Sequence, residues 1–149
     1  MSVERGVIGV GYEGQTIEQL TAGLSSWGVS TLIDVRLNAL SRKHGFSKNG
    51  LRDYLAQTGI DYLHMPELGN LRENREGYGE PDSELGVSAR RVFTERMSSP
   101  GAEARLDEIV GLANVGLVAV LCYEKSEREC HRHEVLDALR ERLALLVDA

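Results

Sequence analysis

The segment from Cys122 to Leu143, CYEKSERECHRHEVLDALRERL, holds the residues of this chain best suited to chemistry. A thiol beside an imidazole is the usual pairing of a nucleophile with its base, and a nearby carboxylate can accept or donate the same proton. We therefore take Cys130 as the candidate nucleophile, with His131 and Glu124 as the candidate base and acid. This assignment depends on how the segment folds.

A helix is predicted to begin inside this segment. Ser126 and Glu129 have the spacing of a capping box, which predicts a helix start at Ser126. Cys130 would then lie in the second turn, beside Glu127 and Glu129, and both carboxylates would disfavour its thiolate. Cys122 ends an apolar run and is expected to be a small buried core residue. In a reducing compartment a disulfide is less expected than free thiols, metal ligands or core residues.

A metal site is the alternative interpretation of the same cluster. Cys122, Cys130, His131 and His133 lack the C-x-x-C or H-x-x-x-H spacing of structural zinc sites. Residues two apart on a helix also diverge by about 200°. We assign no metal ligands and no required cofactor, and keep an open site for a divalent metal as an alternative.

A second group of candidates is basic. Arg36 to Arg52 contains five Lys or Arg and no acid, whereas the whole chain has 17 basic and 23 acidic residues and a net charge of −6. The loop residues of this stretch suit an anion, because arginine offers a planar fork to phosphate or carboxylate. An equally simple alternative for Asp34 and Arg36 is a structural ion pair, since both side chains leave the strand on the same face. The candidate anion-binding residues are Arg36, Arg42, Arg132, Ser41 and Lys48, and the orienting residues are Asp34 and His64.

The elements that must position these residues alternate between strand and helix. Apolar runs predict strands, periodic runs predict helices, and a polar stretch rich in Gly and Pro predicts a long loop. The strands are expected at 6–12, 29–35, 60–65 and 116–123, the helices at 16–27, 49–59, 83–97, 102–114 and from 126, and the loop at 66–82.

This alternation predicts an α/β fold. We expect one three-layer Rossmann-like domain over residues 1–149, with a mainly parallel sheet of four to five strands flanked by helices. Ligands of such sheets bind beyond the carboxyl ends of the strands, where nearly all the candidates fall. The loop from Asn70 to Asp82 is a candidate lid over that edge. The stretch GVGYEG (9–14) has the G-x-G-x-x-G spacing of dinucleotide-binding sites. The pattern that marks the start of the next helix begins only at Thr16, after the third glycine, so a tight turn between strand and helix is favoured.

Length and composition narrow the class of protein. The chain has 149 residues, of which 42% are hydrophobic, enough for one globular core. No apolar run approaches a membrane span and the start has no signal-peptide pattern, so we expect a cytoplasmic protein with no membrane contact. The net charge argues against a uniformly basic nucleic-acid binder.

Four motifs together resemble a known family. They are GYEGQTIEQL, LIDVRLNALSRKHGFSKNGL, GIDYLHMPELG and VLCYEKSERECHR, in order from about Val7 to Arg132. The chain resembles the bacterial family catalogued as domain of unknown function 488, with Ala39 and Asn70 where a proline and a glycine are usual. The resemblance implies an α/β fold and supplies no activity.

The functional expectation therefore comes from the residues. We expect an anion-binding pocket at the carboxyl edge of the sheet, for a phosphorylated small molecule, a nucleotide or nucleic acid. Catalysis there would use Cys130, His131 and Glu124 in a hydrolase or transferase reaction. The alternatives are a non-catalytic nucleic-acid or partner-binding module, and a metal-dependent hydrolase using Cys130 and histidines. The reaction, substrate and oligomeric state do not follow from the sequence.

Overall fold

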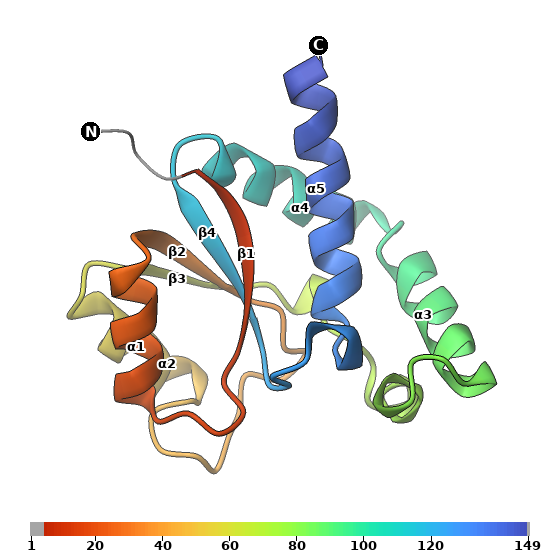
Figure 1. Cartoon of the computed structure of the whole chain (residues 1–149), viewed down its shortest axis with the longest axis horizontal. Coiled ribbons are helices and arrows are strands. Elements are labelled where there is room, and N and C mark those ends of the chain that lie inside the picture. Colours follow the sequence, from red (N-terminus) through yellow and green to blue (C-terminus); the bar gives the residue numbers. More distant parts are fainter. Residues whose placement is uncertain (1–4, 149) are drawn as a thin grey trace.

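The computed structural model describes residues 5–148 and shows a four-stranded sheet in the order β1-β4-β2-β3 (Figure 1). All its strand pairs are parallel. Their carboxyl ends therefore meet at one edge, as predicted. The strands are β1 (Gly6–Gly11), β2 (Val29–Asp34), β3 (Asp61–His64) and β4 (Leu117–Cys122).

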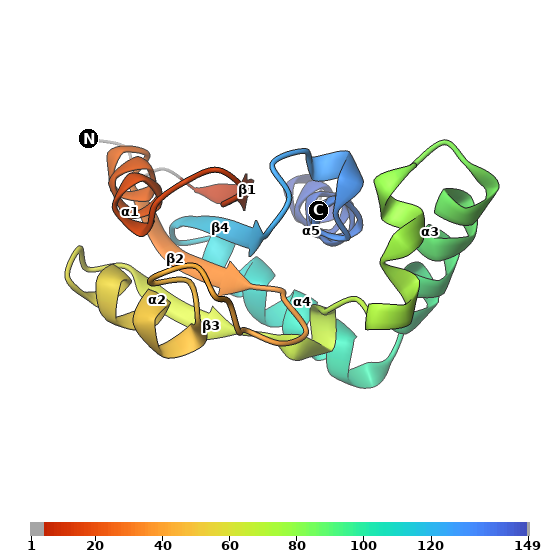
Figure 2. The ribbon, with the colours of Figure 1, turned by 90° about the horizontal axis from the view of Figure 1, so that it is seen from below.

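Helices cover both faces of this sheet (Figure 2). α1 (Ile17–Ser26) and α2 (Lys48–Ala56) pack on one face, and α4 (Pro100–Ala113) and α5 (Arg132–Asp148) pack on the other. α3 (Glu84–Arg96) lies outside α5, next to the segment that follows β3. The α/β fold and the three-layer arrangement predicted from the alternation of elements are thus confirmed.

The alternation of side chains along the central strands produces two separate cores. In β4, Ala119 and Leu121 face α1 and α2, whereas Val118 and Val120 face α4 and α5. All six residues of β4 are buried, as expected for an apolar parallel strand that is covered on both faces. No helix within residues 5–148 is long and apolar enough to cross a membrane.

Most element boundaries match the prediction, and one important boundary does not. Thr16 caps α1 through the predicted box with Gln19. The expected helix start at Ser126 is wrong: a short 3-10 turn, Glu127–Glu129, comes first, and α5 begins only at Arg132. Ser126 makes no side-chain cap bond, and Cys130 has an extended backbone, with φ −138° and ψ 145°. Cys130 therefore precedes the helix.

The glycines of β1 have a packing role. An added Cβ would lie 2.7 Å from Leu136 at Gly9 and 1.9 Å from the carbonyl oxygen of Glu124 at Gly11. These glycines let α5 and the end of β4 lie directly against β1. Their spacing therefore has a structural explanation that needs no bound dinucleotide.

Candidate functional site

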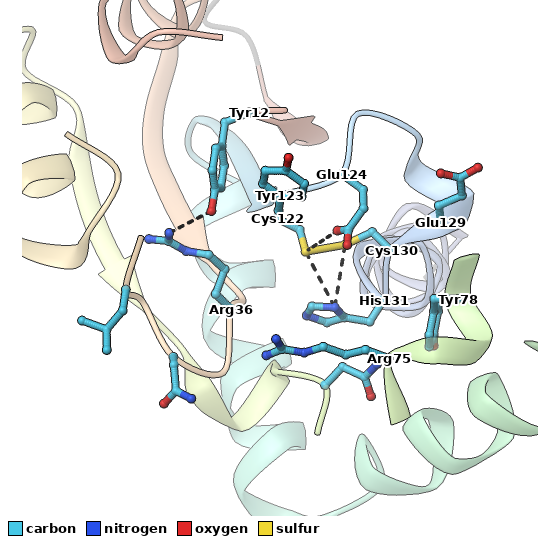
Figure 3. A pocket seen from close by; sticks show the side chains of 13 residues that line it. Tyr12, Arg36, Arg75, Tyr78, Cys122, Tyr123, Glu124, Glu129, Cys130 and His131 are labelled. Atoms are coloured by element: carbon cyan, nitrogen blue, oxygen red, sulfur yellow. Dashed lines mark hydrogen bonds between the residues drawn. A yellow bond between two sulfur atoms is a disulfide. The ribbon is translucent and has the colours of Figure 1, made fainter. Parts of the chain in front are cut away.

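A pocket of about 150 Å³ lies at the carboxyl edge of the sheet (Figure 3). Its walls come from the ends of β1, β2 and β4, from the turn before α5, and from the segment after β3. It brings together three residues predicted as catalytic, Glu124, Cys130 and His131, with Arg36 from the basic group. The other lining residues are Tyr12, Asn38, Leu40, Asn70, Arg75, Tyr78, Cys122, Tyr123 and Glu129.

Cys122 and Cys130 form a disulfide in the wall of this pocket. The expected burial of Cys122 in the core is confirmed, whereas the preference for unpaired thiols was wrong. The cause is the late start of α5. Because Cys130 lies in an extended turn instead of a helix, its side chain reaches back to the end of β4. Both cysteines are nearly buried, with 5% of Cys122 and 2% of Cys130 exposed.

His131 faces both sulfur atoms. Its Nδ1 lies 3.8 Å from Sγ of Cys122 and 3.7 Å from Sγ of Cys130. Its Nε2 lies 2.7 Å from the backbone oxygen of Val35, and since a carbonyl can only accept, Nε2 carries the proton. Nδ1 therefore presents a lone pair to the sulfurs. Phe93 packs edge-on against the ring, with the centroids 5.1 Å apart, and holds it in this position.

The environment keeps this imidazole neutral. Burial lowers the pKa of His131 to about 4, and the charges of Arg75 and Arg132 act in the same direction, against the hydrogen bond to Val35. A group with this pKa accepts a hydrogen bond from a thiol but is a weak proton sink at neutral pH. His131, which was predicted to be a general base, is therefore better suited to accept a hydrogen bond than to take up a proton.

Cys130 lies at the amino end of α5. The backbone N–H of Arg132 approaches its sulfur at 3.4 Å, and its own carbonyl accepts from the N–H of His133. The first N–H groups of a helix and its dipole stabilise a negative charge, so this position favours a thiolate. The predicted second-turn position of Cys130 is therefore wrong, whereas Glu129 still lines the same pocket as Cys130.

Glu124 is the second polar group beside the sulfurs. Its Oε2 lies 3.4 Å from Sγ of Cys122, the distance at which a thiol would donate to it. Burial raises the pKa of this carboxyl, although Arg132 and Arg75 oppose the shift. A carboxyl with a raised pKa exchanges protons more readily near neutral pH. In the dithiol state each cysteine thus has its own acceptor, Glu124 for Cys122 and His131 for Cys130.

Arg36 is held almost entirely by internal partners. Its Nε and Nη2 bind Asp34 at 2.9 and 2.7 Å, and its Nη1 donates to Tyr12 and to the carbonyl of Phe46. Tyr62 completes the arrangement with a 2.5 Å bond to Asp34. This is the structural ion pair considered as the alternative. Arg36 nonetheless lines the pocket.

Arg132 is also occupied by the protein. Its Nη1 donates to the carbonyl oxygens of Val10 (2.7 Å) and Glu124 (3.0 Å), and Nη2 reaches that of Lys125. With 2% exposure it does not line the pocket. The contacts make Arg132 a clamp that joins α5 to the ends of β1 and β4.

The remaining predicted residues lie outside the pocket. Arg42 and Lys48 are exposed, and Ser41 shapes its own loop by accepting from the N–H of Lys43 and bonding Ser47. His64 bonds the backbone oxygen of Arg36 at 2.7 Å, which suits an orienting role. Arg42, Lys48 and Ser41 therefore do not line the pocket that holds the cysteine pair.

The sequence of the chain matches the model of a protein family. The model described as Domain of unknown function DUF488 matches residues 16–139. The chain belongs to this family. The DUF488 match contains both cysteines, His131, Glu124 and Arg36 of the pocket. Neither the curated proteins nor the solved structures gave a match.

The DUF488 pocket also contains residues that were not among the main candidates from the sequence. Arg75 was expected to add charge if the loop 70–82 closed over the pocket, and its side chain extends beside His131 into the pocket (Figure 3). Asn74 ties this segment to Asn70 and to the carbonyl of Ala89 in α3. Cys122 could have been found from its position two residues before Glu124, because alternate strand residues share a face.

Proposed function

We propose that this protein is a thiol-dependent enzyme whose pocket takes a small anionic substrate, and that Cys122 and Cys130 alternate between dithiol and disulfide. The observation that carries the proposal is the geometry of the sulfur pair. It lies in a pocket wall, at a helix amino end, with His131 beside both sulfurs and Glu124 beside that of Cys122. A disulfide that only braces the fold needs neither acceptor.

The proposed exchange reaction balances with a small disulfide as the oxidant. The Cys130 thiolate attacks one sulfur of the substrate, and the first substrate thiolate leaves. Cys122 passes its proton to Glu124 and attacks the sulfur of Cys130, which releases the second substrate thiolate. The substrate gains two electrons and becomes two thiols, while the protein dithiol becomes the disulfide. The reverse sequence reduces the protein.

Arg75 supports an anionic substrate. Arg36 is already neutralised by Asp34, so it adds little net charge. The guanidinium of Arg75 lies in the pocket, and no ion pair joins it to another side chain of the described residues. Tyr123 and Leu40, both largely exposed, supply an apolar rim on the same pocket. The arrangement suits a small molecule with one charged end and one apolar part.

The test compares two disulfides of different charge. Reduced, metal-free protein is mixed with oxidised glutathione, which is anionic, and with neutral 2-hydroxyethyl disulfide, and thiol release is timed. Cys130→Ser should abolish exchange with both. Arg75→Gln should slow only the anionic reaction, roughly 3- to 10-fold, the size of one partly screened charge interaction.

Arg72→Gln is the matched control, because Arg72 lies in the same segment and does not line the pocket. It should leave both rates unchanged. If the dithiol of the wild type reacts no faster than a free model thiol at the same pH, the proposal fails.

The basic loop supports a second candidate, the nucleic-acid-binding module. Arg42 and Lys48 are exposed and do not line the pocket of the cysteine pair, so they could contact a phosphate backbone independently. The test is fluorescence anisotropy with short single-stranded DNA and RNA. Binding should fall steeply with salt and with Arg42→Ala, and be unaffected by Cys130→Ser. Salt-independent binding would contradict this candidate.

A further inference from the structure

We propose that the reduced form of the cysteine pair is a metal site, in which Cys122, Cys130 and His131 hold one zinc ion and leave a fourth position open to the pocket. The inference goes beyond thiol exchange and does not depend on it. It assigns a cofactor to these residues.

The donor atoms are already grouped. The two sulfurs and Nδ1 of His131 lie within 4.8 Å of one another, and all three residues are buried. In tetrahedral zinc sites, Zn–S bonds of about 2.3 Å and Zn–N bonds of about 2.0 Å place sulfur and nitrogen roughly 3.6 Å apart. The separations from Nδ1 to the two sulfurs are 3.8 and 3.7 Å. The imidazole thus needs little movement to share an ion with both thiolates.

The cysteine backbones also allow an intervening ion. Their Cα atoms are 7.0 Å apart, slightly beyond the range of roughly 4.4–6.8 Å usual for disulfides. Two thiolates on one zinc ion have sulfurs about 3.8 Å apart, which a small rotation of each side chain would provide. The extended turn at Cys130 and the end of β4 would not have to move.

The surroundings of His131 are those of a metal ligand. Metal-binding histidines almost always donate the N–H of the other ring nitrogen to a carbonyl or carboxylate, which fixes the ring and its tautomer. Here Nε2 donates to Val35 at 2.7 Å, and Nδ1 faces the sulfurs. Phe93 packs against the ring. The lone pair therefore points at the position that the ion would occupy.

The donor set indicates both the metal and its use. Two thiolates and an imidazole favour zinc over magnesium or calcium, which prefer oxygen. Three protein ligands with one open position are the pattern of catalytic zinc sites, whereas structural sites have four. Glu124, 3.4 Å from Cys122, would lie close enough to hydrogen-bond a water in the open fourth position.

Binding is tied to oxidation state by simple stoichiometry. The disulfide must first gain two electrons from a reductant, here a phosphine, which becomes the phosphine oxide. The two thiols then lose two protons to solvent as one zinc ion binds. Oxidation by a disulfide reverses this and expels the ion.

The experiment uses tag-free full-length protein. Protein reduced with tris(2-carboxyethyl)phosphine is loaded with zinc alone, desalted without oxygen and measured by plasma mass spectrometry. Affinity is obtained by competition with a chromophoric chelator. Wild type should hold one zinc per chain, and His131→Gln and Cys130→Ser should lower the affinity at least about 100-fold. Cobalt in place of zinc should give the intense visible absorption of a tetrahedral thiolate site.

The controls separate ligation from folding. His133→Gln removes a neighbouring imidazole that bonds Glu127 and Asp137, and it should retain the full zinc content. The oxidised wild type has the same sequence and should hold no zinc. Equal zinc in the reduced and oxidised proteins, or in reduced wild type and a Cys122→Ser/Cys130→Ser variant, overturns the inference. Because disulfide exchange is timed on metal-free protein, zinc binding without exchange would refute the proposed function alone, and exchange without zinc would refute this inference alone.

Discussion

Replacing Gly11 with alanine tests the contact that positions the pocket. The new Cβ would lie 1.9 Å from the backbone oxygen of Glu124 and 2.9 Å from Nη1 of Arg132. Carbon and oxygen normally approach to about 3.4 Å, so the two chain segments must separate by roughly 1.5 Å. Neither can move freely, because the carbonyl of Glu124 is held by Arg132 at 3.0 Å.

The cost of this separation has two parts. Overpacking a closed contact costs about 1–3 kcal/mol. The shift also strains the bonds by which Tyr12 and Glu13 donate to Cys122 and Tyr123, each contributing about 0.5–1.5 kcal/mol. Together they predict a loss of about 2–6 kcal/mol. For a chain of this length that lowers the melting temperature by roughly 4–24 °C.

Thermal unfolding followed by circular dichroism measures the effect, with Gly23→Ala as the control. Gly23 is in α1, and an added Cβ there meets no atom within 4 Å. Alanine should stabilise that helix by roughly 0.5–1 kcal/mol. The two variants must therefore shift in opposite directions. A melting temperature of Gly11→Ala within about 1 °C of that of the wild type would contradict the close contact between β1 and Glu124.

Three further substitutions probe other parts of the argument, each by chemical denaturation. Asp34→Ala leaves Arg36 buried without its carboxylate and should cost about 3–5 kcal/mol, and a cost below 1 kcal/mol would mean that Arg36 is free to bind ligands. Arg105→Ala breaks a pair with Glu67 that is 40% and 34% exposed, so its effect should stay below about 1 kcal/mol, and a larger loss would contradict the surface assignment. Thr16→Ala removes the bond that the Thr16 hydroxyl accepts from the N–H of Gln19, while the backbone N–H of Thr16 can still donate to Gln19, so the change should cost about 1 kcal/mol and Thr16→Ser should restore most of it.

The fold could be predicted because its signals are local. The apolar run of β4 and the cap at Thr16 each depend on a few neighbouring residues, and parallel pairing follows from the alternation of strands and helices. The gathering of candidates at one sheet edge follows in turn. Local patterns could not predict which hydrogen bonds and ion pairs each side chain makes. Arg36 and Arg132 carry the right groups for an anion, yet buried carbonyls and Asp34 occupy most of their donors.

The error at Ser126 shows why the site itself depends on tertiary structure. The letters SERE match a capping box, but the helix that they would begin is not formed, and a short 3-10 turn takes its place. The competing interactions are distant in sequence. Arg132 donates to the carbonyl of Val10, 122 residues away, and Nε2 of His131 bonds Val35, 96 residues away. These bonds determine where α5 begins.

The delayed helix start creates the chemistry of the pocket. A helix running from Ser126 would leave Cys130 on its flank, whereas the observed turn extends the backbone at Cys130 and directs its sulfur to Cys122. The same turn places the sulfur against the first N–H groups of α5 and the imidazole of His131 beside both sulfurs. Loosening the Arg132 clamp should therefore disrupt the sulfur pair before it disrupts the sheet. Arg132→Met tests this order. The thiols of the reduced variant should react faster with an alkylating reagent than those of reduced wild type, under conditions where the circular dichroism spectrum is unchanged. Equal rates would mean that the Arg132 contacts do not position the sulfur pair.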